Sequence, residues 1–246
     1  TTHGRHDDAR EAAGRGNQES LFGLAILSRW PIEGARIVEL PSPMRFQYDT
    51  EGMYGRFIAL VAAIERPGGP FVAISLHLEV HRTRDHRAAQ MRVLLEHLRD
   101  ERRPIVLGGD FNSHTFDRGR WWDPFTGAAV LSSWPGALLR RRLLWPDRGP
   151  AREPLFDALR EAEFEWHRFV DREPTLHLRF VRVPEARAPL GSPLARPVMA
   201  RAERRAPRRL DWFAGRGWRG GSGKTVRGLD GPGRASDHAP LIAEFW

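Results

Sequence analysis

The stretch Pro104-Ile-Val-Leu-Gly-Gly-Asp110-Phe111-Asn112-Ser113, near the middle of the chain, decides the fold prediction. Its first four residues are apolar and indicate a short buried strand. The two glycines that follow allow the backbone to turn tightly where the strand ends. Asp110 and Asn112 then stand two residues apart at a strand end, where catalytic groups collect in layered α/β folds. An ordinary turn with self-capping side chains explains the same residues equally well.

Two further polar stretches adjoin strand-like runs. Ile74-Ser-Leu-His77-Leu-Glu79 lies upstream, and Ser236-Asp237-His238 lies near the end of the chain. A histidine satisfied within the core is the commoner reading of His77 taken alone, and a plain turn is the commoner reading of the second stretch. Their order relative to Asp110 favours a shared catalytic site.

The three pieces in this order resemble the endonuclease/exonuclease/phosphatase superfamily, which has the deoxyribonuclease I-like fold. Residues 23–32 (Gly-Leu-Ala-Ile-Leu-Ser-Arg-Trp-Pro-Ile) look like an early strand of that family. Residues 87–90 (Arg-Ala-Ala-Gln) resemble its RxxQ helix start, and residues 210–213 (Leu-Asp-Trp-Phe) its (I/L)DY(I/F) strand. The resemblance runs from residue 22 to residue 246. It implies an α/β fold, a four-layer sandwich of two packed mixed β-sheets flanked by helices.

One part of the family pattern has no counterpart. A strand carrying an Asn and a strand ending in Gln-Glu, whose Glu holds the metal, should precede residues 23–32. Gln18-Glu19 does not fit, because it follows the polar, turn-like residues 14–17 and directly adjoins the next strand. We expect a disordered or truncated leader over residues 1–20, followed by one family domain over residues 21–246 that lacks those strands. A fully degenerate relative is the alternative.

The resemblance also implies roles for matching residues. Hydrolysis of a phosphoester requires neutralised phosphoryl oxygens, a base for the attacking water and a stabilised leaving group. Asp110 should position or deprotonate the water, and Asn112 should hold it together with a phosphate oxygen. Asp237 should contact the metal with Asp110 as a second oxygen donor, in keeping with the preference of magnesium for carboxylate oxygen.

The two histidines complete the implied site. His238 should donate to a phosphate oxygen, with its other ring nitrogen oriented by Asp211. A carboxylate behind an imidazole fixes the tautomer and favours the charged ring, which suits an anionic substrate. His77 should be a second phosphate donor.

The predicted function is a metal-dependent phosphoester hydrolase that uses Mg²⁺ or Mn²⁺. The expected partner is a phosphoester substrate (a nucleic acid, a phospholipid headgroup or a small phosphodiester), with no obligate protein partner and a monomeric chain. Two alternatives stay open. One is a catalytically impaired binding module on the same scaffold. The other is a membrane-surface, sphingomyelinase-like phosphodiesterase whose tryptophans within residues 116–145 touch lipid.

Charge and composition limit these functional interpretations. The chain has 246 residues, a net charge of +8 and a sequence pI of about 11.1. Residues 179–209 hold nine arginines, two glutamates and five prolines, so the remainder is nearly neutral. This segment predicts a mobile loop on the rim of the cleft, either attracting polyanions or acting as a bystander. The lack of cysteine excludes disulfides and favours a cytoplasmic location, with targeting left open because an N-terminal signal could be missing.

Local patterns place the remaining elements. Residues 220–225 (Gly-Gly-Ser-Gly-Lys-Thr) are not a phosphate-binding P-loop, because the first glycine and the preceding apolar strand are both missing. The patterns predict strands at residues 22–27, 36–40, 56–65, 70–79, 105–107, 210–213 and 240–245, and helices at residues 84–103 and 153–162.

Overall fold

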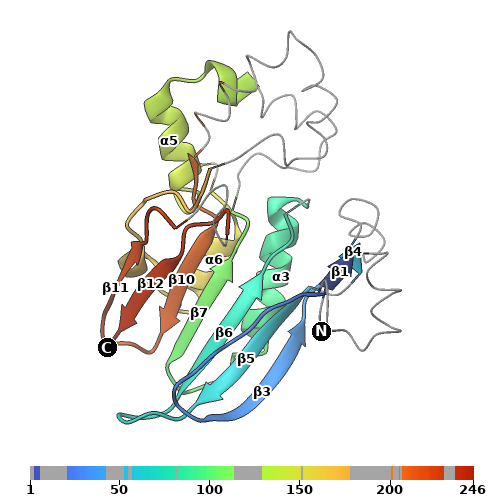
Figure 1. Ribbon diagram of the computed structural model, residues 1–246, viewed down its shortest axis with the longest axis vertical. Helices are drawn as coiled ribbons and strands as arrows, with labels where there is room; N and C mark the ends of the chain where they lie inside the picture. The colour runs from blue at the N-terminus through green and yellow to red at the C-terminus, as the bar shows by residue number, and fades with distance from the viewer. Residues whose placement is uncertain are drawn as a thin grey trace.

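A five-stranded mixed sheet lies at the centre of the computed structural model (Figure 1). The structure describes residues 3–5, 21–42, 53–54, 57–80, 82–113, 129–150, 152–177, 201, 205, 207–229 and 236–246. The strand order is β10-β7-β6-β5-β3, and β6 and β7 run parallel while the other pairs are antiparallel. The strands are β3 (Ile32–Glu39), β5 (Ile58–Ile64), β6 (Phe71–His77), β7 (Ile105–Asp110) and β10 (Asp211–Arg216).

Three smaller sheets complete the strands of the described residues. β11 (Gly221–Thr225) pairs with β12 (Leu241–Phe245), and β8 (Leu176–His177) pairs with β9 (Pro207–Arg208). β1 (His3–Arg5) lies between β2 (Leu21–Phe22) and β4 (Met53–Tyr54). The described residues thus show the mixed α/β class, with one five-stranded sheet, smaller ladders and helices.

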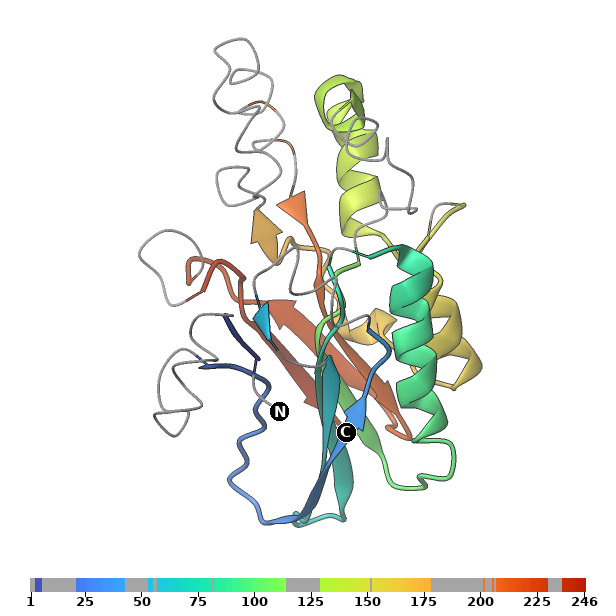
Figure 2. The same cartoon turned by 90° about the vertical axis from the view of Figure 1, so that its right-hand side faces the viewer.

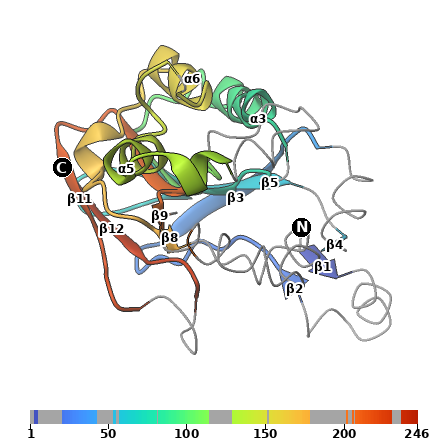
Figure 3. The same ribbon diagram turned by 90° about the horizontal axis from the view of Figure 1, so that it is seen from above.

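Helices α3 (Arg84–Glu96) and α6 (Leu155–Glu161) cover one face of the large sheet (Figures 2 and 3). The parallel β6–β7 connection contains α3, as parallel strands require a crossover. The side chain of Thr83 caps α3 by accepting a hydrogen bond from the His86 amide. The helix α5 (Gly136–Leu144) stands beyond the carboxyl end of β7 (Figure 1), and a 3-10 turn, η1, spans His167–Phe169.

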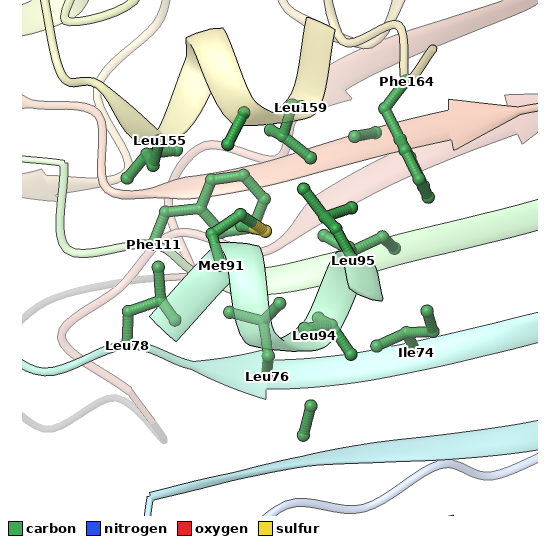
Figure 4. Close-up of a cluster of buried hydrophobic side chains, with 14 of the residues drawn as sticks. Ile74, Leu76, Leu78, Met91, Leu94, Leu95, Phe111, Leu155, Leu159 and Phe164 are labelled. Atoms are coloured by element: carbon green, nitrogen blue, oxygen red, sulfur yellow. The ribbon is translucent and has the colours of Figure 1, made fainter. Parts of the chain in front are cut away.

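The main core fills the space between this sheet face and the two helices (Figure 4). Alternate residues of each strand point to one face, so every second residue of β6 and β7 is buried there. Leu76 of β6, Met91 of α3 and Leu159 of α6 meet in this layer, together with Ile74, Leu78, Leu94, Leu95, Phe111, Leu155 and Phe164. The opposite face is therefore free to carry polar groups.

Gly109 lets β7 pass unusually close to β6. Its φ is +147°, and a Cβ added there would lie 1.9 Å from the carbonyl oxygen of Leu76. Only glycine fits such a backbone and such an approach. The turn expected from the sequence at Gly108-Gly109 is therefore wrong: both glycines lie inside β7, and Gly109 is needed for this close approach.

Two further sequence predictions are corrected by the structure. The strand predicted at residues 22–27 is present only at Leu21–Phe22, and residues 23–28 have no ladder partner, with Leu27 92% exposed. The helix predicted over residues 84–103 ends at Glu96, where the chain enters turns that bury Leu98. Among the described residues, no helix has the length and apolar composition needed to cross a membrane.

Candidate active site

Three predicted site residues lie in one row at the carboxyl ends of β6 and β7. Asp110 ends β7, directly opposite His77 at the end of parallel β6 and Asp211 at the start of antiparallel β10. Residues directly opposite one another in a ladder point to the same face. Trp212, the next residue of β10, packs into the helix-side core. The row therefore lies on the sheet face away from α3 and α6.

His238 joins this row from the segment that precedes β12. Its Nδ1 lies 2.8 Å from Asp211 Oδ2, and Nδ1 donates because a carboxylate only accepts. The pair leaves Nε2 available for a ligand. His77 Nε2 lies 3.7 Å from Asp110 Oδ2, so the second histidine is also near a carboxylate.

Thr175 holds the Asp211 and His238 segments together, and sequence reasoning missed it. Its buried hydroxyl accepts hydrogen bonds from the amides of Leu210 (3.0 Å) and Asp211 (3.2 Å). Its carbonyl accepts one from the amide of Ala239, 2.8 Å away. A lone threonine in a polar stretch gives no sequence signal for such a role.

Asn112 fixes the loop that follows β7. Its backbone is left-handed (φ 46°). The backbone amide of Asn112 donates a hydrogen bond to Asp110 Oδ1 (2.7 Å), and its side-chain Nδ2 donates one to the Leu78 carbonyl (2.7 Å). Its side chain is nearly fully buried. These bonds orient Asp110, while direct contact of Asn112 with water or phosphate stays a prediction.

Burial and neighbouring charge set the protonation of the site. Burial raises the pKa of Asp110, and the negative charge of Asp211 raises it further. The charges of His77 and His238 and the hydrogen bond from the Asn112 backbone amide lower it, but the net shift is upward. Burial opposes the charge on His238, yet the hydrogen bond and charge of Asp211, helped by Asp110 and Asp237, raise its pKa to about 9. At neutral pH His238 is therefore an imidazolium, and it lies near the Asp110 carboxyl group, whose pKa is raised.

Asp110, Asp211 and His238 also form a candidate metal-binding group. One ligand atom from each residue lies within 4.8 Å of the others. The donor set fits magnesium, because two half-buried carboxylates supply hard oxygen ligands and a cation would relieve their mutual repulsion. Asp237 is exposed and outside this group, so its metal contact stays a prediction.

Replacing Asp211 with asparagine is expected to return the pKa of His238 from about 9 toward its ordinary value of about 6.5, because the carboxylate partner is lost. NMR titration of the ring protons in metal-free protein measures this, with exposed His97 as an internal control. Because the pKa of His238 is raised in the folded state, protonation of His238 stabilises the fold. This stabilisation is complete below pH ~6.5, and it is lost above about pH 9. Wild type should therefore lose stability relative to the variant over that interval; an unchanged His238 titration would contradict the assignment.

A family model described as the Endonuclease/Exonuclease/phosphatase family matches residues 2–238. The chain belongs to this family. A search among curated proteins returned no match.

Solved structures share the fold of this family member at low identity. Beta toxin from Staphylococcus aureus has 17% identity and a TM-score of 0.52, covering 88% of this chain and 65% of that one. A double mutant of that toxin with bound magnesium ions has 15% identity and a TM-score of 0.50, with 88% and 65% coverage. The endonuclease/exonuclease/phosphatase from Bacteroides vulgatus has 16% identity and a TM-score of 0.50, with 88% and 66% coverage. The chain spans less than two thirds of the length of each.

Proposed function

We propose that this chain is a metal-dependent phosphoester hydrolase. The observation that carries the proposal is the convergence of His77, Asp110, Asp211 and His238 on one edge of the sheet. We also propose the four-layer sandwich of the family as the complete architecture, with β11 and β12 in the second sheet. A monomer with a phosphoester as its only required partner accompanies this proposal.

The site residues divide the work of hydrolysis. Asp110, with its raised pKa, accepts the proton of the attacking water, since a base works best when its pKa approaches the working pH. His238 donates from Nε2 to a phosphoryl oxygen while Asp211 holds the ring, and His77 donates from the β6 side. Mg²⁺ or Mn²⁺ would be held by Asp110 and Asp211, and also by Asp237, as the family resemblance implies. The bound ion would supply positive charge for the phosphoryl oxygens.

A lipid phosphodiester is a second candidate substrate, favoured by one surface feature. Trp134 (37% exposed) precedes α5, and the helix itself carries Leu138 (53% exposed) and the exposed Arg140 and Arg141. Apolar and basic side chains together suit an anionic membrane surface. The other tryptophans of the predicted lipid contact, Trp121 and Trp122, lie outside the described residues, whereas Trp145 stacks with Arg172.

A substrate panel tests the proposal. Bis(p-nitrophenyl) phosphate, p-nitrophenyl phosphate, a DNA oligonucleotide and phospholipid vesicles are each incubated with the protein in Mg²⁺, in Mn²⁺ or in EDTA. We expect hydrolysis of at least one phosphodiester with metal and none in EDTA. Hydrolysis of none of the four substrates, or hydrolysis that EDTA leaves unchanged, would overturn it. Preference for vesicles over the soluble diester would favour the lipid candidate.

A further inference from the structure

A glutamine of α3, Gln90, is fully buried and holds two backbone groups outside its own helix. Its Oε1 accepts a hydrogen bond from the Glu79 amide (3.0 Å), and its Nε2 donates one to the Pro41 carbonyl (2.9 Å). An amide N–H only donates and a carbonyl only accepts, so these two partners fix the orientation of the side chain. Figure 4 shows Met91, the next residue of α3, and Leu78, the residue after β6, in the same buried layer. Gln90 therefore reaches from the helix layer to the chain that leaves β6.

A continuous chain of hydrogen bonds runs from Gln90 to Asp110. Its middle link is the peptide unit between Leu78 and Glu79. The N–H of this unit donates to Gln90, and its carbonyl accepts from Asn112 Nδ2, 2.7 Å away. The backbone amide of Asn112 in turn donates to Asp110 Oδ1 at 2.7 Å. A peptide unit is planar, so a partner that holds its N–H also fixes the direction of its carbonyl. Gln90 thereby sets the direction of the carbonyl that Asn112 binds.

Asn112 depends on that carbonyl for its unusual backbone. Its φ of 46° lies in the left-handed region, which residues other than glycine keep only when their surroundings hold them there. Its side chain is buried, so loss of the bond to Leu78 would leave a buried donor unpaired, which is unfavourable. The shape of the chain directly after Asp110 therefore depends on the orientation of the Leu78–Glu79 peptide.

We propose that Gln90 is a positioning residue for Asp110, acting through the Leu78–Glu79 peptide and Asn112. The inference deepens the proposed phosphoester hydrolysis and rests on it. Gln90 belongs to α3, which covers the sheet face opposite the row of site residues, so its role is to hold the site and not to react. The motif at residues 87–90, which the sequence showed without a role in the site, thereby acquires one.

Hydrogen exchange of backbone amides, followed by NMR, tests the hydrogen-bond chain without turnover. Gln90→Met keeps a similar side-chain volume and offers neither hydrogen bond. In this variant the exchange rate of the Asn112 amide, divided by that of Leu107 in the middle of β7, should rise about tenfold, the scale of one hydrogen bond. Leu95→Ala is the matched control, because it removes a buried side chain of the same helix that takes no part in the chain of bonds. It should lower the Tm without raising that ratio.

Hydrolysis of bis(p-nitrophenyl) phosphate shows whether the chain of bonds matters for the reaction. Gln90→Met should lower kcat about tenfold and change KM less than about twofold, because Asp110 prepares the attacking water and does not bind the ester. Rates are measured well below the Tm of each variant, so that an unfolded fraction does not lower kcat. Leu95→Ala should keep both constants. If Gln90→Met does not fold, Gln90→Asn, whose shorter side chain cannot span both partners, replaces it in each measurement.

A double-mutant cycle with Asn112→Ala identifies the route. If Gln90 acts through Asn112, then adding Gln90→Met to Asn112→Ala should lower kcat no further. Reductions in kcat that multiply in the double variant would mean that Gln90 acts by another route, and they would overturn the inference.

The two kinds of measurement separate failure of this inference from failure of the function on which it rests. A wild type that hydrolyses the ester, with Gln90→Met unchanged in kcat or in the exchange ratio, overturns the inference and leaves the function standing. If wild type hydrolyses no ester, the function fails, and the exchange ratio alone decides whether Gln90 holds Asn112. A raised ratio then supports that contact, and an unchanged ratio overturns it as well.

Discussion

Replacing Asp110 with asparagine is expected to lower the metal-dependent hydrolysis rate about 10³-fold or more. The change removes the proposed base and one candidate metal carboxylate, and each such group contributes on the order of 10² to 10⁴. Asparagine keeps the shape of the side chain and an oxygen that can accept the Asn112 amide. The rate is measured with bis(p-nitrophenyl) phosphate at saturating Mg²⁺.

The stability of this variant should move in the opposite direction. Burial raises the pKa of Asp110, so its charged form destabilises the folded protein at pH values above the unfolded pKa. Asp110→Asn should therefore melt at a higher temperature than wild type at neutral pH. Asp100→Asn, which removes an exposed carboxylate in the turn after α3, is the control and should change neither property. A rate within tenfold of wild type would rule out Asp110 as the base.

Glu153→Gln is expected to lower the free energy of unfolding by about 3 to 5 kcal/mol, the range for breaking a buried ion pair. Arg87 and Glu153 are both fully buried, with Arg87 Nη2 2.8 Å from Oε1 and Nε 3.4 Å from Oε2. Without the carboxylate, the charge of Arg87 stays buried and uncompensated. Urea denaturation measures the loss.

Two controls define the origin of that loss. Glu96→Gln breaks the exposed pair between Glu96, the last residue of α3, and Arg99 in the following turn, and should cost less than about 1 kcal/mol. Joint replacement of Arg87 with methionine and Glu153 with leucine should recover much of the stability, because no charge then remains buried. If Glu153→Gln unfolds at the same urea concentration as wild type, the pair does not hold the α3 start in place.

The sequence predicted best the elements with strong apolar patterns. Strands β5, β6 and β7 and the start of α3 lie within one to three residues of their predicted limits, since each buries a regular set of side chains. The Arg-Ala-Ala-Gln motif also has a physical basis. Arg87 pairs with Glu153, while Gln90 accepts from the Glu79 amide (3.0 Å) and donates to the Pro41 carbonyl (2.9 Å). The motif thus ties α3 to the end of the histidine strand.

Elements without such patterns were missed for tertiary reasons. β3 starts at Ile32 rather than at residue 36, because an exposed edge strand carries little apolar alternation. β11 has two glycines where a Cβ would meet Phe169, 2.1 Å away at Gly221 and 2.2 Å away at Gly223. Only the packed aromatic residue explains those glycines, and their place in a strand agrees with the rejection of a P-loop.

Residues 179–209 were predicted to form a mobile loop at the rim of the cleft. Most of that segment lies outside the described residues, but Pro207–Arg208 forms β9 beside β8. Sequence order alone could not show this pairing, because strand partners far apart in the chain are set by the tertiary fold. The same pairing holds Thr175 beside the start of β10, where its hydroxyl accepts from the Asp211 amide.

The position of a bound ion tests the central claim, a metal-dependent site formed by Asp110 and Asp211 with His77 and His238, most directly. Mn²⁺ broadens NMR signals of nearby nuclei, so it is titrated into the protein while the histidine ring protons are observed. Substoichiometric Mn²⁺ is expected to broaden the His77 and His238 signals, to leave that of His97 at the far end of α3 sharp, and to be displaced by Mg²⁺. Sharp His77 and His238 signals, or equal broadening of all three, would contradict a metal site at these carboxylates.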